Sequence, residues 1–539
     1  MTSHTKLEKP ATSAGMTRRL MIGSMSAALA ARAQTNRPSR RKPNFLFILA
    51  DDHAGYVLGC DGNPLATTPN LDHLAGEGTR FSAHHCNSPV CTPSRQSFLT
   101  GQLPHAAGVT VLSTPLSADK PTLAKQFKKA SYQTAVFGKM HFNRPAEPGL
   151  HGFDVMVTED EIMRAWIAEV KPKPIPRDIP TKPAQWAPFQ DQARIWLNGD
   201  KLPCARYDAE MRGTYIGRRV IQYLEENRDK QFALWASFQE PHSPFDFPVE
   251  DRALFDEKLF QPPRVGPEDA WQIPLIFRDL TDNDKRGIIA AYYTSVAFLD
   301  RNVGRVLDAL RRLDLEDNTY VIYMADHGYD LGQHGRFEKH CGYDPALRVP
   351  LIMRFPGRIR RGVVTDLTEH IDVSATICDM MDLDPLAKMH GHTLRRYLEG
   401  RRMDNRRHHV FSEYLENEEA FIRTPEWKYI FCSGRRVRTD GYKTDNPAPG
   451  RYCRLYDLKN DPGEFTDVAP KHPEMVDRFE NLMLERFRST HPGREKEPQR
   501  LSRAEAIEYY LPPRDPVPRL SGSFRTPLGG NWGYPCVQG

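Results

Sequence analysis

The sequence predicts an α/β fold in which helices flank a large, mostly parallel sheet, followed by a smaller C-terminal α+β subdomain. Continuous apolar runs such as residues 44–50 are typical of strands that are buried on both faces. These runs alternate with helical patterns such as residues 284–313, as expected when helices join parallel strands. Beyond residue 400 the strand-like segments become short, and residues 473–488 form a terminal helical pattern, which predicts an antiparallel sheet with a helix.

Length and composition are those of a globular protein. The chain has 539 residues, 39% hydrophobic and 27% charged, which is enough for one large domain and a smaller one. We predict a leader in residues 1–42, the main domain in 43–400, the subdomain in 401–490 and an irregular extension in 491–539. The net charge of +5 is small for this length, and the sequence has no basic stripe with interleaved aromatic residues, so we expect no nucleic-acid partner.

Residues 1–42 have the layout of an export signal. Arg18 and Arg19 precede a short apolar run that ends near residue 33, which indicates a twin-arginine signal peptide; a disordered basic extension is the alternative. The run is too short to anchor the chain in a bilayer, and no later stretch of the sequence is long and apolar enough. We therefore expect an exported protein, periplasmic or secreted, with no membrane anchor after signal cleavage.

Four predicted strands of the main domain end in polar side chains. The apolar runs 44–50, 133–137, 232–238 and 319–325 are followed by Asp51 and Asp52, by Lys139 and His141, by His242, and by Asp326 and His327. Each of these alone is also typical of a solvated turn. Because α/β sheets bind ligands at the carboxyl ends of their strands, we expect the four strand ends to form one site. If the backbone stays extended, Lys139 and His141 project from the same face.

The adjacent carboxylates Asp51 and Asp52 favour a cation. They follow a buried strand directly, where they repel each other unless a positive charge lies between them. Hard divalent cations take oxygen ligands of this kind. The sequence therefore predicts a metal site at this strand end.

Cys91 opens the pentapeptide Cys91-Thr92-Pro93-Ser94-Arg95, which leads into a run that can form a helix. Proline fits the first helical turn, so Cys91 is expected near a helix N-terminus, where free N–H groups and the helix dipole favour anions. This position suits a nucleophile that meets an anionic substrate; a buried structural cysteine is the alternative.

The nine cysteines show no CxxC spacing, so neither a zinc ribbon nor a thioredoxin-like site is indicated. Export would permit disulfides. Cys432 and Cys453 flank one polar loop and are candidates for a pair, although pairing cannot be deduced from sequence.

The pentapeptide that starts at Cys91 resembles the signature of the type I, formylglycine-dependent sulfatases, which belong to the alkaline-phosphatase-like superfamily. Other short motifs follow in the order of that family from Asn44 to about Val468. The motifs most similar to the iduronate-2-sulfatase and choline-sulfatase branches are Asp326-His327, Lys339-x-x-x-Tyr343-Asp344 and Pro241-His242-x-Pro244-Phe245. The resemblance implies an alkaline-phosphatase-like sheet and a maturation enzyme that oxidises Cys91 to formylglycine, which is hydrated to a geminal diol.

The resemblance also implies a role for each candidate residue. The implied metal ligands are Asp51, Asp52, Asp326, His327 and the converted Cys91. Arg95 would hold the formylglycine hydrate, Lys139 and Lys339 would bind the sulfate, His141 would lie beside the nucleophile, and His242 would protonate the leaving oxygen. We expect Ca²⁺ from the resemblance, with Mn²⁺, which an imidazole ligand helps to accommodate, and Mg²⁺ as alternatives.

The chemistry requires these residue types. One diol oxygen attacks the sulfate ester, made more nucleophilic by a metal and by a neighbouring carboxylate such as Asp326, while cations offset the charge on the other sulfate oxygens. A general acid is needed because most sugar alkoxides leave poorly without a proton. The second hydroxyl then expels sulfate from the covalent intermediate and regenerates the aldehyde.

The sequence therefore predicts a sulfatase that hydrolyses a sulfate ester, on a carbohydrate or a small molecule, to an alcohol and inorganic sulfate. Two alternatives remain: a phosphonate monoester or phosphodiester hydrolase that uses the same residues, and an inactive glycan-binding member of the family. Residues 160–215, which we interpret as an insertion over the rim of the site, and residues 414–419 carry no pattern that identifies the substrate.

Overall fold

The computed structural model describes residues 1, 42–144, 146–183, 191–436, 438, 441–445 and 450–514. By its internal contacts the chain divides into two units, residues 1–42 and 43–539, and the elements named below belong to the second. The predicted export signal lies outside the described residues. Among the described helices, none is long and apolar enough to cross a membrane. The expected boundaries at residues 400 and 490 stay predictions.

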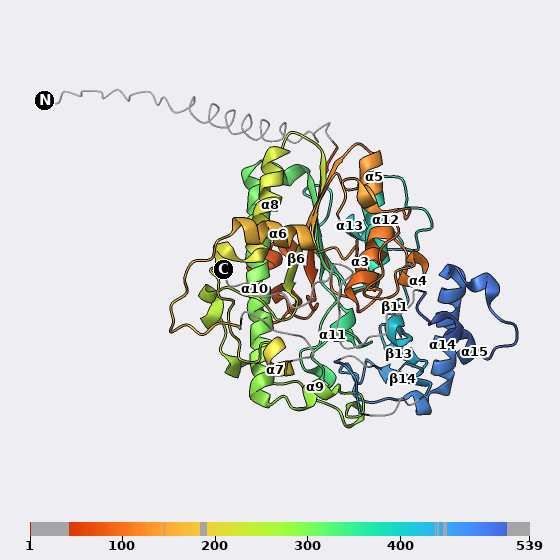
Figure 1. Cartoon of the computed structure of the whole chain (residues 1–539). Coiled ribbons are helices and arrows are strands. Elements are labelled where there is room, and N and C mark those ends of the chain that lie inside the picture. The colour runs from red at the N-terminus through yellow and green to blue at the C-terminus, as the bar shows by residue number, and fades with distance from the viewer. Residues whose placement is uncertain are drawn as a thin grey trace. The chain divides into compact units, whose positions relative to one another are not determined.

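An eight-stranded, mostly parallel sheet forms the centre of the main domain, as predicted (Figure 1). In spatial order its strands are β5 (Val155–Thr158), β4 (Gln133–Gly138), β6 (Phe232–Pro241), β1 (Asn44–Asp51), β7 (Thr319–Ala325), β8 (Leu351–Arg354), β2 (Thr79–Phe81) and β9 (Gly362–Val364). The first five strands run parallel, and β8 is antiparallel to both of its neighbours. A separate short parallel pair joins β3 (His84–His85) to β10 (Thr368–Glu369).

Helices cover both faces of the large sheet, which explains why its central strands are apolar throughout. On one side lie α8 (Arg212–Glu226) and α10 (Asp282–Arg312), and on the other α3 (Cys91–Thr100), α5 (Leu123–Lys129) and α12 (His370–Met380) (Figure 1). Alternate residues of β1 enter the two cores: Leu46 and Ile48 pack with side chains of α8 and α10, whereas Phe45 and Phe47 pack with those of α3, α5 and α12.

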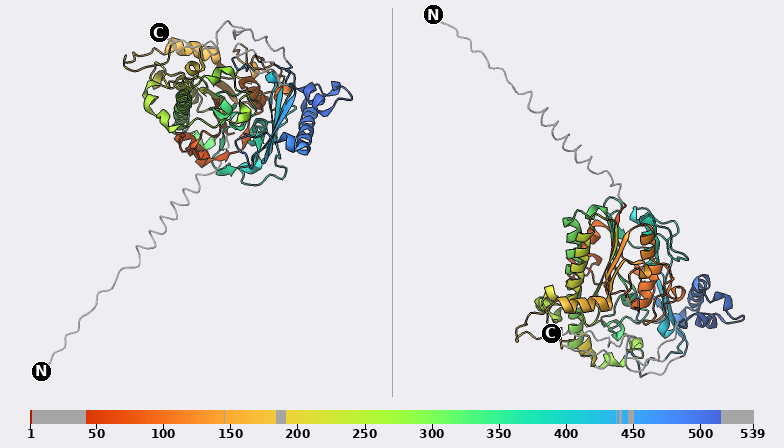
Figure 2. Two further views of the ribbon diagram at one scale, coloured as in Figure 1. Left: turned by 90° about the horizontal axis from the view of Figure 1, so that it is seen from below. Right: turned by 45° about the horizontal axis from the view of Figure 1, so that its top comes forward.

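The C-terminal subdomain is an antiparallel sheet covered by helices, as predicted (Figure 2). Its strands are β11 (Val410–Tyr414), β12 (Glu419–Arg423), β13 (Trp427–Cys432) and β14 (Tyr452–Asp457). Tyr429 of β13 stacks on Phe479 of α14 (Pro473–Thr490), with ring centroids 5.7 Å apart. Residues 503–510, where we expected irregular structure, form α15 (Arg503–Tyr510), which packs on α14.

The remaining helices are short or lie in loops. They are α2 (Pro69–Glu77), α4 (Pro104–Ala107), α6 (Glu159–Glu169), α7 (Ala193–Trp196), α9 (Leu275–Arg278), α11 (Asp344–Leu347) and α13 (Arg395–Leu398). Helix α6 was not predicted, because its apolar residues are spread around the helix instead of forming one stripe, and only Ile162 and Trp166 are buried.

Cys432 and Cys453, the candidates for a pair, are not joined by a disulfide. Every cysteine of the described residues is a free thiol. In the ladder between β13 and β14, Cys432 lies opposite Tyr452 and Cys453 lies opposite Phe431. Because facing residues share a face and successive residues alternate, the two thiols project from opposite faces of the sheet.

Candidate active site

The carboxyl ends of four neighbouring parallel strands meet at one place. The strands β4, β6, β1 and β7 lie side by side in the sheet, and the polar side chains identified in the sequence follow them directly. The amino end of α3 and the loop after β7 reach the same place, so Cys91 and Lys339 join the strand ends. The expectation that four distant segments form one site is confirmed.

Asp51 and Asp52 occupy the turn at the end of β1. Asp51 is the last residue of the strand, and Asp52 has a left-handed backbone with φ of +67° that turns the chain out of the sheet. Tyr292 of α10 holds this turn: its hydroxyl donates to the Asp52 carbonyl over 2.5 Å and accepts from the Ala54 N–H over 2.9 Å. Both carboxylates are therefore fixed and fully buried.

Cys91 is the first residue of α3, as expected, and its thiol lies at the centre of the polar cluster. Its Sγ is 3.1 Å from His327 Nε2, 3.2 Å from Lys339 Nζ and 3.6 Å from Asp51 Oδ1. The residue is 2% exposed. Burial raises the pKa of Cys91 to about 12 in spite of Lys139 and Lys339, so the unmodified side chain stays a thiol and is a poor nucleophile.

Arg95 lies one helical turn after Cys91 and reaches the same cluster. Its Nε donates to Asp326 Oδ2 over 2.8 Å. A second nitrogen donates to the Ser237 hydroxyl over 2.9 Å and to the Lys139 carbonyl. This fully buried guanidinium ties α3 to the ends of β4, β6 and β7.

Two lysines neutralise the two carboxylates of β1. Lys139 Nζ donates to Asp51, and Lys339 Nζ donates to Asp52 Oδ1 over 2.7 Å. Burial raises the pKa of Asp52 to about 7, and Lys339 offsets this only in part. For Asp51 burial acts in the same direction, but Lys139 and the neighbouring cations outweigh it and hold the pKa well below its usual range.

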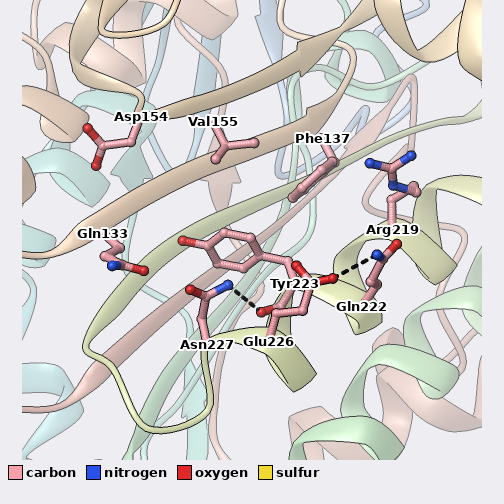
Figure 3. Close-up of a pocket in the computed structure, with 9 residues that line it drawn as sticks. All are labelled: Gln133, Phe137, Asp154, Val155, Arg219, Gln222, Tyr223, Glu226 and Asn227. Atoms are coloured by element: carbon pink, nitrogen blue, oxygen red, sulfur yellow. Dashed lines mark hydrogen bonds between the residues drawn. The ribbon is translucent and has the colours of Figure 1, made fainter.

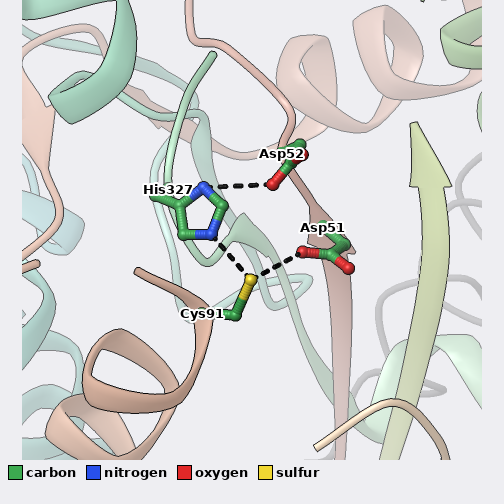
Figure 4. Close-up of side chains that lie close together, drawn as sticks. All are labelled: Asp51, Asp52, Cys91 and His327. Atoms are coloured by element: carbon green, nitrogen blue, oxygen red, sulfur yellow. Dashed lines mark hydrogen bonds and ion pairs between the residues drawn. The ribbon is translucent and has the colours of Figure 1, made fainter. Parts of the chain in front are cut away.

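Four side chains form a group that fits a metal ion (Figure 4). One potential ligand atom from each of Asp51, Asp52, Cys91 and His327 lies within 4.8 Å of all the others. Asp52 Oδ2 is buried and has no hydrogen-bond partner among the described residues, which is costly unless a cation binds there. Two carboxylates and an imidazole are a suitable donor set for a divalent cation.

Asp326 lies beside this group, but its oxygens are engaged. Oδ1 accepts the backbone N–H groups of Asp52 and His327 over 3.1 and 2.9 Å, and Oδ2 accepts Arg95 Nε. Its Oδ2 is 3.5 Å from His327 Nε2. Asp326 thus fixes the turn that carries the other ligands, and a role as direct metal ligand stays a prediction.

His242 stands at the edge of the cluster. Its side chain is 23% exposed, whereas the other site side chains named above are buried. The ring Nδ1 is 2.7 Å from the Ser243 carbonyl, and Nε2 is 4.0 Å from Asp52 Oδ2. If Nδ1 carries the proton that bonds to Ser243, Nε2 faces the cluster. Burial, Lys339 and Lys139 lower its pKa well below the usual range, so the ring is neutral.

His141 is also brought to this part of the molecule, but not by strand alternation. Gly138 ends β4 with φ of +101°, and His141 itself has φ of +53°, so the extended backbone on which the alignment of Lys139 with His141 was conditional is not present there. A side chain at Gly138 would collide with the Ser237 carbonyl. Burial and the nearby Lys139 lower the pKa of His141 well below its usual range.

Sequence reasoning missed two supporting residues, Ser237 and Tyr292. Ser237 bridges Arg95 and the Lys139 carbonyl. It is the only hydroxyl in the apolar run 232–238, a signal that was available in the sequence. Tyr292 lies within the apolar stripe of α10, where nothing distinguishes it from a core residue.

A surface cavity of about 350 Å³ lies away from these residues (Figure 3). It opens between β4, the start of β5 and α8, and contains none of the candidate site residues. Its polar side chains have protein partners: Gln222 donates to Glu226 over 2.8 Å within the cavity, and Arg219 and Asp154 pair with Glu169 and Lys128 outside it. The cavity offers no chemistry comparable to that around Cys91.

Comparison with known proteins gives consistent matches along the chain. A family model described as Sulfatase matches residues 43–383, and one described as N-sulphoglucosamine sulphohydrolase, C-terminal, matches residues 332–489. Choline-sulfatase of Rhizobium meliloti (strain 1021) is 28% identical over 483 residues, covering 84% of this chain and 87% of the relative. Iduronate 2-sulfatase of Mus musculus is 30% identical over 370 residues, covering 63% of this chain and 64% of the relative.

Solved structures share the fold. The crystal structure of the phosphonate monoester hydrolase of Agrobacterium radiobacter superposes with a TM-score of 0.70 at 24% identity, covering 84% of this chain and 96% of that one. The expected alkaline-phosphatase-like architecture, with its large sheet and C-terminal antiparallel sheet, is confirmed.

Proposed function

This chain belongs to the sulfatase family, whose members are sulfuric ester hydrolases, and from that premise we propose that it hydrolyses a sulfate ester of a carbohydrate through formylglycine made from Cys91. One observation carries the proposal. Two ammonium groups, a buried guanidinium and a group of potential metal ligands all surround one thiol, at the amino end of a helix. This arrangement attracts an anion to the reacting atom.

The state of Cys91 supports a modified nucleophile. A buried thiol with a pKa raised to about 12 supplies almost no thiolate at neutral pH. Because the side chain is 2% exposed in the folded protein, we propose that the maturation enzyme acts on the chain before it folds. The diol of hydrated formylglycine would supply one hydroxyl for attack and a second for release of sulfate.

The charge of the site supports an anionic substrate. Three carboxylates, Asp51, Asp52 and Asp326, are matched by three cations, Arg95, Lys139 and Lys339. A divalent cation held by Asp51, Asp52, His327 and residue 91 would add positive charge and stabilise negative charge that develops on the sulfate oxygens. From the family resemblance we propose Ca²⁺, with Mn²⁺, which the imidazole ligand would favour, and Mg²⁺ as alternatives.

We propose that His242 gives a proton to the leaving oxygen. It lies at the exposed edge of the site, where the alcohol portion of the substrate would leave. Burial, Lys339 and Lys139 hold its pKa low in spite of the nearby Asp51, and a bound sulfate would raise the pKa by opposite charge. Protonation of His242 is therefore coupled to substrate binding.

The test begins with the modification. Mass spectrometry of the tryptic peptide 81–95 is expected to show a species lighter than the cysteine form that reacts with a hydrazide. The modified protein, dialysed against a chelator, should regain hydrolysis of p-nitrophenyl sulfate with Ca²⁺ more than with Mn²⁺ or Mg²⁺.

Two outcomes would change the assignment. Faster turnover of bis-p-nitrophenyl phosphate than of p-nitrophenyl sulfate under the same conditions would favour the phosphodiester hydrolase. Cysteine that persists after co-expression with a maturation enzyme would favour an inactive glycan-binding protein.

Export is also proposed, on the layout of residues 1–42. Arg18 and Arg19 before a short apolar run support a twin-arginine signal and a periplasmic or secreted enzyme. Replacement of both arginines by lysine should keep the protein in the cytoplasm, as measured by fractionation; unchanged export would contradict this type of signal.

A further inference from the structure

A second cavity, of about 130 Å³, lies next to the candidate active site. We call it the Arg454 cavity. It is lined on one side by the segment 340–343, which directly follows Lys339, and on the other by the C-terminal sheet and the segment before β14. Lys339 Nζ is 3.2 Å from Cys91 Sγ, and consecutive Cα atoms are about 3.8 Å apart. The Lys339 side chain contacts the thiol of Cys91, and the next residue of the chain lines the cavity, so the cavity lies about one lysine side chain away from that thiol.

Arg454 is a buried cation without a carboxylate partner. The residue is 6% exposed, and one of its terminal nitrogens donates to the hydroxyls of Tyr343 and Tyr456 over 2.9 and 3.2 Å. Among the described residues no carboxylate lies within 4.0 Å of its guanidinium. A buried charge of this kind is costly unless an anion binds to it, and the planar guanidinium suits sulfate and carboxylate groups.

The other charges around the cavity are largely neutralised. Arg336 pairs with Glu338 over 2.5 Å, and Arg436 pairs with Glu418 over 2.9 Å. Glu419 lines the same cavity and accepts from Asn417 over 2.5 Å. Glu419 attracts Arg336, Arg438 and Arg454 together, so a single carboxylate of this cavity faces three guanidinium groups, of which Arg454 is the buried one.

Aromatic rings form the adjoining wall. The Arg454 guanidinium lies 4.6 Å from the ring centroid of Trp271, and Tyr452 meets Trp271 edge to face at 5.5 Å. Apolar faces next to a few placed polar groups are typical of small-molecule sites, and the stacked guanidinium is held in one orientation. The cavity can therefore receive a sugar ring that carries an acidic group.

We propose that the Arg454 cavity is a second anion subsite, which binds a sulfate or carboxylate group that the substrate carries in addition to the ester that is hydrolysed. The inference rests on the proposed function at Cys91 and narrows the substrate to carbohydrates with at least two anionic groups. Arg454 is a binding residue in this proposal and takes no part in bond cleavage.

Calorimetric binding tests the proposal without turnover. Cys91→Ala protein in calcium-containing buffer is titrated with glucosamine 6-sulfate, with glucosamine-2-N,6-O-disulfate and with a monosulfated disaccharide that contains a uronic acid. At least one doubly charged probe should bind about tenfold more tightly than glucosamine 6-sulfate, and Arg454→Ala should remove this advantage. The disulfate and the uronic acid distinguish sulfate from carboxylate as the second group.

Matched variants control for charge and folding. Arg451→Ala removes an exposed arginine that pairs with Glu508 over 2.6 Å, three residues before Arg454, and should leave all affinities unchanged. Arg454→Lys keeps the positive charge and should recover part of the tighter binding of the doubly charged probe. It replaces Arg454→Ala in the test if that variant does not fold. The proposal is overturned if no doubly charged probe binds better than the singly charged one, or if the advantage survives in both Arg454 variants.

A separate readout distinguishes this failure from failure of the proposed function. Hydrolysis of p-nitrophenyl sulfate by protein with Cys91 intact should be equal in wild type and Arg454→Ala, because this substrate has one anionic group. Absence of that hydrolysis in modified wild type would refute the sulfatase reaction, whereas normal hydrolysis with equal probe affinities would refute only the subsite.

Discussion

At the scale of single residues, the site combines groups whose ionisation burial has shifted. Burial makes the thiol of Cys91 a weak acid and His242 a weak base, with pKa values displaced in opposite directions. In these protonation states neither side chain can carry out its proposed role. Cys91 requires a chemical modification, and His242 requires the negative charge of a bound substrate.

Substitution of Cys91 by alanine should abolish turnover while the fold persists. The expected loss of kcat for p-nitrophenyl sulfate is about a thousandfold or more, since no other nucleophile lies in the cluster. Cys86→Ala is the matched control, because Cys86 is equally buried and its thiol donates to the Ala346 carbonyl over 3.8 Å. Residual activity of Cys91→Ala comparable to wild type would refute the assigned nucleophile.

Substitution of His242 by glutamine should affect substrates according to their leaving groups. Sugar sulfates need a proton on the departing oxygen and are expected to lose about 10² to 10⁴ in kcat, whereas p-nitrophenyl sulfate should lose far less. Steady-state kinetics on both substrates measures the difference, with His73→Gln, an exposed histidine of α2, as control. Equal losses on the two substrates would contradict the role as general acid.

At the scale of elements, the strands were predictable and some of the turns were not. The ends of β1, β4, β6 and β7 follow from apolar runs that stop abruptly at charged residues, a local signal. The left-handed backbone at His141 depends on Gly138 and on contacts of its N–H with Glu159, which is distant in sequence. The local sequence pattern therefore identified the site residues, but it could not predict how the turns orient their side chains.

The junction between α11 and β13 is expected to depend on one buried lysine. Lys428 is fully buried, and its Nζ is 2.7 Å from Asp344 Oδ1, 3.1 Å from Glu464 Oε1 and 2.9 Å from the Gly342 carbonyl. Lys428→Met should lower the free energy of unfolding by about 3–5 kcal/mol, because it leaves the buried Glu464 and the partly buried Asp344 without this cation. Urea denaturation measures the change.

The control for this prediction is Lys459→Met, an exposed lysine after β14, which should change stability by less than about 0.5 kcal/mol. A Lys428→Met protein as stable as the control would show that Arg423, 3.1 Å from Asp344, suffices to neutralise the junction.

At the scale of the whole molecule, tertiary structure brings together what no local pattern links. The residues around Cys91 were assigned from the sequence because each lies at a strand end or within a family motif. The Arg454 cavity was not, because segments 340–343 and 417–454 meet only in the folded chain. In the same way, whether Cys432 and Cys453 can pair depends on the register of β13 and β14, which sequence does not specify.

The contribution of Glu240, at the end of β6, to the stability of the fold should fall as pH rises. This side chain is 3% exposed, and its Oε2 has no hydrogen-bond partner among the described residues. Burial raises its pKa from 4.5 to about 7, with Arg212 opposing in part. At Glu240 the folded state therefore binds more protons than the unfolded state between about pH 4.5 and 7, so the stability that this residue contributes decreases with pH across that window.

Glu240→Gln imitates the protonated form and should be more stable than wild type at pH 8, by up to about 3 kcal/mol, and nearly equal to it at pH 4.5. Denaturant unfolding at several pH values measures this difference for the pair of proteins, so that other titrating groups cancel. A constant difference between pH 4.5 and 8 would mean that Glu240 ionises at its ordinary pKa inside the fold, with Arg212 compensating fully for burial.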